Sequence, residues 1–150
     1  MKLRWAALAT VLTMGVMVTP RHAAGQGTQP AGDRSSVAVL GQNYPNPFNP
    51  TTTIPFSVGD APACSDHSRV YRVTLRIYNV LAQLVAIPIM QGTSGSAGRP
   101  LEDVALTCGQ YTAYWDGNYM RSGREVASGV YLYRLEVDGK ALVRKMIVMK

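Results

Sequence analysis

The residues of this chain that could do chemistry gather in one short polar stretch, Cys64 to Ser68, which reads CSDHS. Ser, Asp and His side chains form hydrolytic triads, but a triad needs the three groups to converge beside an oxyanion site. Neighbouring side chains on an extended segment point in different directions, which works against such convergence. We therefore interpret the stretch as a solvated loop and expect no catalytic residues and no enzyme activity.

A second polar group, Asp116-Gly117-Asn118, resembles the start of a calcium-binding loop. An EF-hand loop would require Asp or Asn at the position of Met120 and Glu at the position of Ala127. Neither requirement is met, so an Asx-type turn is the better interpretation. We expect no metal site and no cofactor.

Aromatic and basic residues offer two further possibilities. The tyrosines and tryptophan at 111, 115, 131 and 133 could form a sugar-binding platform, but their alternate spacing favours burial in a sheet. Arg69, Arg72 and Arg76 with Tyr78 could form a basic face, which a solvated side of a sheet explains better. Neither pattern predicts a nucleic-acid partner or a small-molecule substrate.

The N-terminus has the layout of a secretory signal peptide. Lys2 and Arg4 precede an uncharged apolar run at 5–19, and small residues follow in HAAGQG. The run has 15 residues, fewer than the ~18 that a transmembrane helix needs, although an uncleaved anchor stays an alternative. We expect residues 1–25 to be removed and the product to be exported to the periplasm, the outer-membrane surface or the medium. Cleavage would remove three basic residues and lower the net charge from +6 to +3, too modest to indicate nucleic-acid binding.

The two cysteines, Cys64 and Cys108, are interpreted in the light of export. An oxidising compartment and an even count favour one disulfide, which would close a loop of about 45 residues. Two buried thiols are the alternative. A metal site is less favoured because the chain has no CxxC motif, and His67 is the only histidine after the expected cleavage point.

The chain after residue 36 has the pattern of an all-β domain. Residues 26–36 are small and polar, which predicts a flexible tether, and 37–150 contain short alternating runs separated by Gly, Pro and Asn. We expect about seven strands in an immunoglobulin-like antiparallel β-sandwich, with a small barrel as the alternative. Pro55 is expected to put its strand at an edge or in a bulge. The expected strands are 37–40, 51–58, 70–80, 83–90, one ending at 115, 129–137 and 141–149, the last two joined by an Asp138-Gly139 turn.

Several motifs occur in an order that is typical of one family. LGQNYPNPFNPTTTIPF, VTLRIYNVLAQLV and YWDGNYMRSGREVASGVYLYRLEVDGKALVRKMIVMK together resemble the C-terminal sorting domains of type IX secretion cargo and the related immunoglobulin-like domain of flagellar hook-capping proteins. The resemblance covers residues 40–150. It implies a β-sandwich without catalytic activity whose partners are proteins of an outer-membrane export or anchoring machinery. It also implies two recognition elements, a loop of Pro45, Asn46, Pro47, Phe48, Asn49 and Pro50, and a terminal strand with Arg144, Lys145, Met146 and Lys150.

The physical character of the loop follows from its prolines. Each proline fixes its own φ and disfavours the helical region for the residue before it, and Asn side chains can close Asx turns onto nearby amides. Phe48 is the one large apolar side chain between Pro47 and Ile54. We expect it to insert beside the core and to set where the next strand begins. A rigid entry into the sheet and a partner-binding loop both remain open.

The expected leader and domain are separated only by the short tether, whereas sorting domains usually end a larger protein. This arrangement favours a second hypothesis as well: a standalone structural or adhesive envelope module related to the hook-cap domain.

Overall fold

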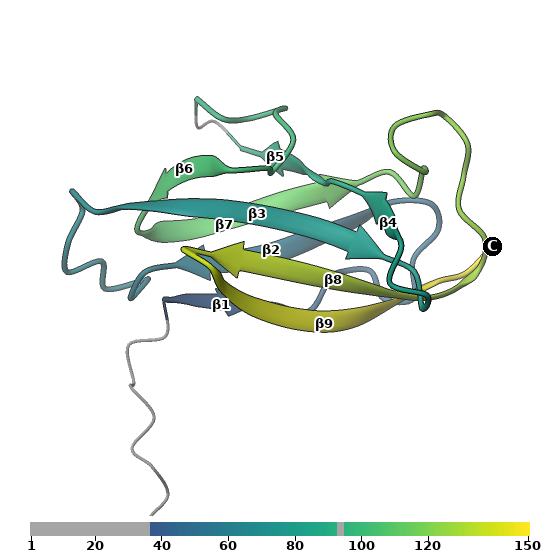
Figure 1. Ribbon diagram of the computed structural model, residues 1–150, viewed down its shortest axis with the longest axis horizontal. Helices are drawn as coiled ribbons and strands as arrows, with labels where there is room; N and C mark the ends of the chain where they lie inside the picture. Colours follow the sequence, from purple (N-terminus) through teal and green to yellow (C-terminus); the bar gives the residue numbers. More distant parts are fainter. Residues whose placement is uncertain (1–36, 93–94) are drawn as a thin grey trace, which may run out of the picture. The chain divides into compact units, whose positions relative to one another are not determined.

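The computed structural model describes residues 37–92 and 95–150 as an immunoglobulin-like antiparallel β-sandwich (Figure 1). The expected signal peptide and tether lie outside these residues. In the described part of the chain all regular structure is strand, and no helix there is long and apolar enough to cross a membrane.

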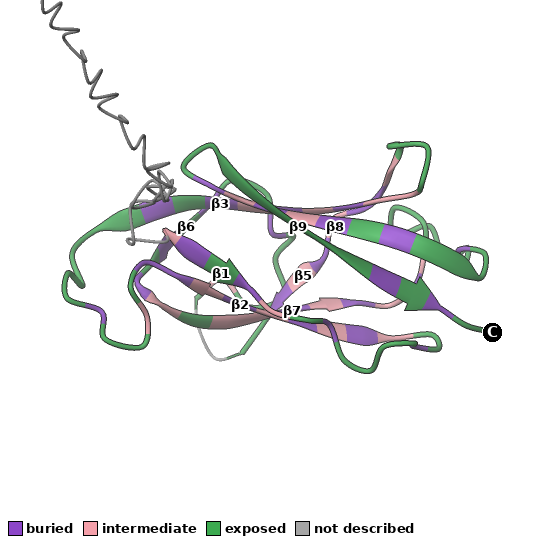
Figure 2. Cartoon of the chain, turned by 90° about the horizontal axis from the view of Figure 1, so that it is seen from below, coloured by how far each residue is buried: buried purple, intermediate pink, exposed green. Residues whose placement is uncertain are grey.

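The two layers seen in Figure 2 are both antiparallel sheets. The first sheet has the order β1 (Ala38–Leu40), β2 (Thr52–Val58), β7 (Gly109–Trp115) and β5 (Ile89–Gln91). The second has the order β4 (Leu84–Ala86), β3 (Val70–Tyr78), β8 (Gly129–Val137) and β9 (Lys140–Val148), and β6 (Val104–Thr107) pairs with the first part of β3.

The core lies between the sheets and follows the alternation of the sequence. Successive side chains of a strand point to opposite faces, so every second residue is buried. In β3 the buried side chains alternate with Arg72, Thr74 and Arg76, as predicted. The apolar residues buried from β2, β3 and β8 are Ile54, Phe56 and Val58 in β2, Tyr71, Val73, Leu75 and Ile77 in β3, and Tyr131, Tyr133, Leu135 and Val137 in β8.

The predicted hairpin between β8 and β9 is confirmed. Asp138 and Gly139 have φ values of 47° and 81°, the left-handed conformation that a two-residue hairpin turn of this type requires at both central positions. The nine-residue register of β8 with β9 is continuous through this turn.

The described residues form nine strands instead of about seven. The expected strand at 83–90 is in fact two strands, β4 in the second sheet and β5 in the first, because the chain crosses between the layers at Ile87 and Pro88. β6 is an additional short strand that the sequence analysis did not predict. These differences add elements to the sandwich and leave its two-layer architecture unchanged.

The prediction that Pro55 places its strand at an edge or in a bulge is wrong. β2 lies between β1 and β7, and its register with β7 is unbroken at Pro55. The carbonyl of Pro55 accepts a hydrogen bond from the Gly41 N–H at 2.8 Å, so the nitrogen of Pro55 also faces the β1 side, beyond the point where β1 ends. Because this nitrogen faces away from β7, the lack of an N–H at Pro55 costs no hydrogen bond between β2 and β7.

Candidate functional site

The predicted recognition loop and the predicted terminal strand lie side by side. The Phe48 N–H donates to the Ile147 carbonyl at 3.0 Å, and the Met149 N–H donates to the Phe48 carbonyl at 3.0 Å. Phe48 and Val148 thus form a parallel bridge along the outer edge of β9. Segments about 100 residues apart in the sequence form one continuous surface.

Asn46 strengthens this attachment. Its Oδ1 accepts a hydrogen bond from the Ile147 N–H at 2.9 Å. The sequence suggested that this side chain closes a local Asx turn. Instead, its Oδ1 binds the edge of β9. The peptide bonds before Pro45, Pro47 and Pro50 are cis.

Phe48 is the apolar anchor of the loop, as predicted. Its side chain is 2% exposed, and its ring lies edge-on to Trp115 with 5.5 Å between centroids. Trp115 in turn lies edge-on to Tyr131 at 5.8 Å. Trp115, Tyr131 and Tyr133 are buried core residues, and Tyr111 is partly buried against the core, so these side chains do not form an exposed platform.

The turn after β7 has the predicted Asx form. The Asp116 Oδ1 accepts the Asn118 N–H at 2.9 Å, and the Trp115 Nε1 donates to the Asn118 carbonyl at 3.0 Å. The turn thus holds the tryptophan on which Phe48 packs.

A buried polar cluster beneath the loop was missed by the sequence analysis. Asn43 and Thr52 are 1% and 2% exposed, and the Asn43 Nδ2 donates to the Thr52 Oγ1 at 2.9 Å and to the Pro45 carbonyl at 3.1 Å. The Tyr133 hydroxyl donates to the Gly41 carbonyl at 2.8 Å and accepts the Asn43 N–H at 3.1 Å. Burial raises the pKa of Tyr133 above its ordinary value. The sequence holds one indication of this cluster. Thr52 is a polar residue on the same face of β2 as the apolar Ile54 and Phe56, and a buried polar side chain needs hydrogen-bond partners.

The rest of the loop faces solvent. Tyr44 is 58% exposed, and Pro45, Asn46, Pro47, Asn49 and Pro50 are exposed. The loop is therefore anchored at Asn43 and Phe48 and presents the residues between and after them.

The four predicted residues of the terminal strand occupy different environments. Met146 is fully buried in the core, whereas Lys145 is exposed. The Arg144 Nε donates to the Leu40 carbonyl at 2.7 Å, which ties β9 to β1. The Lys150 Nζ lies 2.6 Å from the Glu125 carboxylate. Only part of this strand can therefore present side chains to a partner.

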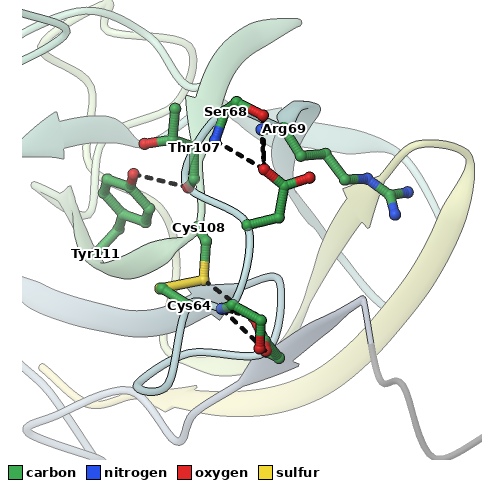
Figure 3. Close-up of a disulfide and its surroundings, with 9 residues drawn as sticks. Cys64, Ser68, Arg69, Thr107, Cys108 and Tyr111 are labelled. Atoms are coloured by element: carbon green, nitrogen blue, oxygen red, sulfur yellow. Dashed lines mark hydrogen bonds between the residues drawn. A yellow bond between two sulfur atoms is a disulfide. The ribbon is translucent and has the colours of Figure 1, made fainter.

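Cys64 and Cys108 form the expected disulfide (Figure 3), with their Cα atoms 5.4 Å apart. Cys108 stands between β6 and β7, where the chain passes from the second sheet to the first, and Cys64 lies in the loop between β2 and β3. The bond holds this long loop against the end of the sandwich.

The CSDHS stretch is part of that loop. Its one carboxylate, that of Asp66, accepts hydrogen bonds from the residues that follow it. Asp66 accepts the N–H of Ser68 at 2.9 Å and the N–H of Arg69 at 3.2 Å (Figure 3), while Ser65 donates to Asp60. The Ser68 hydroxyl also donates to Asp66. The hydroxyl hydrogen bonds of Ser65 and Ser68, and after them the backbone N–H bonds, lower the pKa of Asp60 and Asp66 below the ordinary value. Within the described residues no hydrogen bond joins His67 to Ser65 or Asp66.

Comparisons with protein-family models, with curated proteins and with solved structures found no match.

Proposed function

We propose that this protein is an exported, non-catalytic β-sandwich module that a protein of the outer-membrane export or anchoring machinery recognises, as sorting domains of type IX secretion cargo are recognised. One observation carries the proposal. The two elements that the sequence resemblance singles out, the loop at 45–50 and the terminal strand, are joined by three hydrogen bonds of 2.9–3.0 Å into one surface.

The construction of the loop suits recognition. Phe48 and Asn43 are buried, and Asn46 is bonded to β9, so the backbone is held in place before a partner arrives. A preorganised loop loses little conformational entropy on binding, which favours affinity. Tyr44, an exposed aromatic side chain, is of the type enriched at the centre of protein interfaces.

A second candidate, a standalone structural or adhesive envelope module, is favoured by a different observation. The outer face of the second sheet carries Val130, Leu132 and Ile147, which are 44%, 37% and 37% exposed. Val130 and Ile147 are directly paired across β8 and β9, and Leu132 is next on the same face. Neighbouring exposed apolar side chains of this kind are typical of surfaces that pack against other proteins.

A reporter experiment separates the two candidates. Residues 36–150 are fused behind a reporter with a generic leader and expressed in a host with an active type IX system. Surface delivery supports the sorting function, and periplasmic retention supports the structural module.

Variants then test the loop itself. Phe48→Ala would confuse recognition with folding because Phe48 is buried, so the informative change is the exposed pair Tyr44→Ser with Asn49→Ala. We expect this double variant to lose surface delivery while its Tm stays within ~2 °C of the parent, as surface changes usually do. The matched control is Leu81→Ser, an exposed apolar position in the turn after β3, where the side chain is 74% exposed. Unchanged delivery by the loop variant would exclude the loop from recognition.

A further inference from the structure

The outer edge of β9 is covered along only half of its length. Ile147 bonds to the loop through both its N–H and its carbonyl, and the Lys145 carbonyl accepts a hydrogen bond from the Gln42 side chain at 3.2 Å. Odd-numbered residues of β9 therefore point their backbone groups away from β8. The register with β8 is continuous, so Ala141 and Val143 have the same orientation. Within the described part of the chain, no hydrogen bond to their outward N–H and carbonyl groups is present.

A groove of about 410 Å³ lies beside this uncovered half. It is lined by Ala38, Val39 and Leu40 of β1 and by Leu142, Val143 and Arg144 of β9. β1 and β9 are both edge strands, one in each sheet. Leu142 stands on the same face of β9 as the buried Met146 but is 38% exposed, and the first half of β9 is exposed throughout (Figure 2). An apolar side chain seated in the groove would contact Leu142.

Exposed cations lie along this half of β9. Arg144 lines the groove, Lys140 and Lys145 stand on the same strand, and none of the ion pairs among the described residues includes these three. The carboxylate nearest to Ala141 in the β8–β9 register, Glu136, is already paired with Arg134. An occupant with carboxylates on both sides of its apolar residues would complement this charge.

We propose that the outward edge of β9 at Ala141–Val143 is a strand-addition site that accepts an extended acidic segment of a partner protein. Unpaired strand edges bind extended peptides through main-chain hydrogen bonds, and pockets beside the edge select alternate side chains. The other half of the same edge already holds an extended segment, the loop at Phe48. The inference rests on the proposed function in that it treats the terminal strand as a recognition element and names its mode of binding.

Two other occupants fit less well. Residues 26–36 precede β1 in the chain, but QGTQPAGDRSS contains no large apolar residue to fill the groove. A second copy that paired β9 against β9 would bring the three basic side chains of each copy together, and like charges in an interface oppose association.

The test uses the processed protein purified from a host that expresses the full-length gene. The probe is a fluorescent heptapeptide with two valines two positions apart and two acidic residues on each side. We expect binding by anisotropy and slower amide hydrogen exchange at Ala141 and Val143. A peptide with lysines in place of the acidic residues should bind at least about tenfold more weakly. No binding of the acidic peptide at millimolar concentration, or equal binding of both peptides, would overturn the proposal.

The matched variants are Val143→Pro and Val143→Thr. Proline removes only an outward N–H, as Pro55 does in β2, and we expect about fivefold weaker binding, the equivalent of one net hydrogen bond. Threonine keeps the N–H and should change binding less than about twofold. If Val143→Pro does not fold, a probe N-methylated at its central residue removes the reciprocal donor and should lose binding to the unchanged protein.

The remaining outcomes are also decisive. Unchanged affinity in both experiments overturns the proposal, and so does a concentration-dependent dimer that protects the same amides. Export of the reporter fusion is measured separately. Lost peptide binding with normal delivery would contradict the link to sorting and leave strand addition intact, whereas failed delivery of the parent fusion with intact peptide binding would contradict only the sorting function.

Discussion

The carbonyl oxygen of Pro50 lies 2.3 Å from the point where a Cβ on Gly117 would be. Gly117 also has a φ of +74°. The position therefore favours glycine for two reasons, the left-handed backbone conformation and the lack of space for a side chain. This contact joins the end of the proline-rich loop to the turn after β7. Because that turn also holds Trp115 against Phe48, the two sequence motifs form a single packed unit.

Gly117→Ala should therefore be strongly destabilising. The left-handed φ costs alanine roughly 1 kcal/mol, and the backbone contact with Pro50 forces a displacement that brings the loss to roughly 2–4 kcal/mol. Urea unfolding measures the change. The control is Gly123→Ala, where φ is +72° but nothing lies within 4 Å of the added Cβ, so only the conformational cost remains. Equal losses at the two positions would show that the Pro50 contact is unimportant.

Phe48→Ala should lower the free energy of unfolding by about 3–5 kcal/mol, because it removes a buried ring and leaves a cavity against Trp115. Phe48→Leu keeps most of the apolar volume and should cost clearly less. Thermal unfolding monitored by tryptophan fluorescence reports both stability and the environment of Trp115. A Phe48→Ala variant as stable as the parent would mean that Phe48 does not anchor the loop.

Loss of the disulfide should destabilise the domain through the unfolded state. The bond closes a loop with a sequence separation of 44, and loop-closure entropy predicts roughly 4 kcal/mol for that length. The double variant Cys64→Ser with Cys108→Ser should unfold at lower denaturant concentration by this amount. A reductant should destabilise the parent similarly and should not affect the double variant. If reductant leaves the parent unchanged, the bond does not constrain the chain as described.

Stability should decline in alkaline solution. Burial raises the pKa of Tyr133, so the folded state favours the neutral hydroxyl that donates to Gly41. The contribution is complete below the ordinary pKa of 10.0 and is lost as the pH rises through the folded-state pKa. Urea unfolding between pH 8 and 11 measures the slope.

The control for this slope is Tyr133→Phe. It should be roughly 1–3 kcal/mol less stable at neutral pH, since the buried Asn43 N–H loses its acceptor, and its stability should fall less steeply above pH 10. Tyr131, whose pKa burial also raises, should account for part of the slope that remains. An identical slope in the variant would contradict the role assigned to Tyr133.

The features that were predictable from the sequence are those set by local patterning. Alternation in β3 and β8 identified the buried faces, and Asp138-Gly139 identified the hairpin, because both signals depend on neighbouring residues only. The disulfide followed from cysteine count and the expected compartment. The division of 83–90 between two sheets, and the interior position of β2 despite Pro55, depend on which strands lie alongside and were not predicted.

The candidate recognition surface also has features that local sequence patterns predict and features that depend on the tertiary structure. The sequence by itself determined that the loop at 45–50 is rigid, because proline restricts φ, and that Phe48 is its apolar anchor. Only the tertiary structure decided that this loop lies on β9, that Asn46 bonds to Ile147 and that half of the β9 edge stays open. Hydrogen bonds between segments about 100 residues apart depend on how the two sheets pack, and local sequence patterns do not predict that packing.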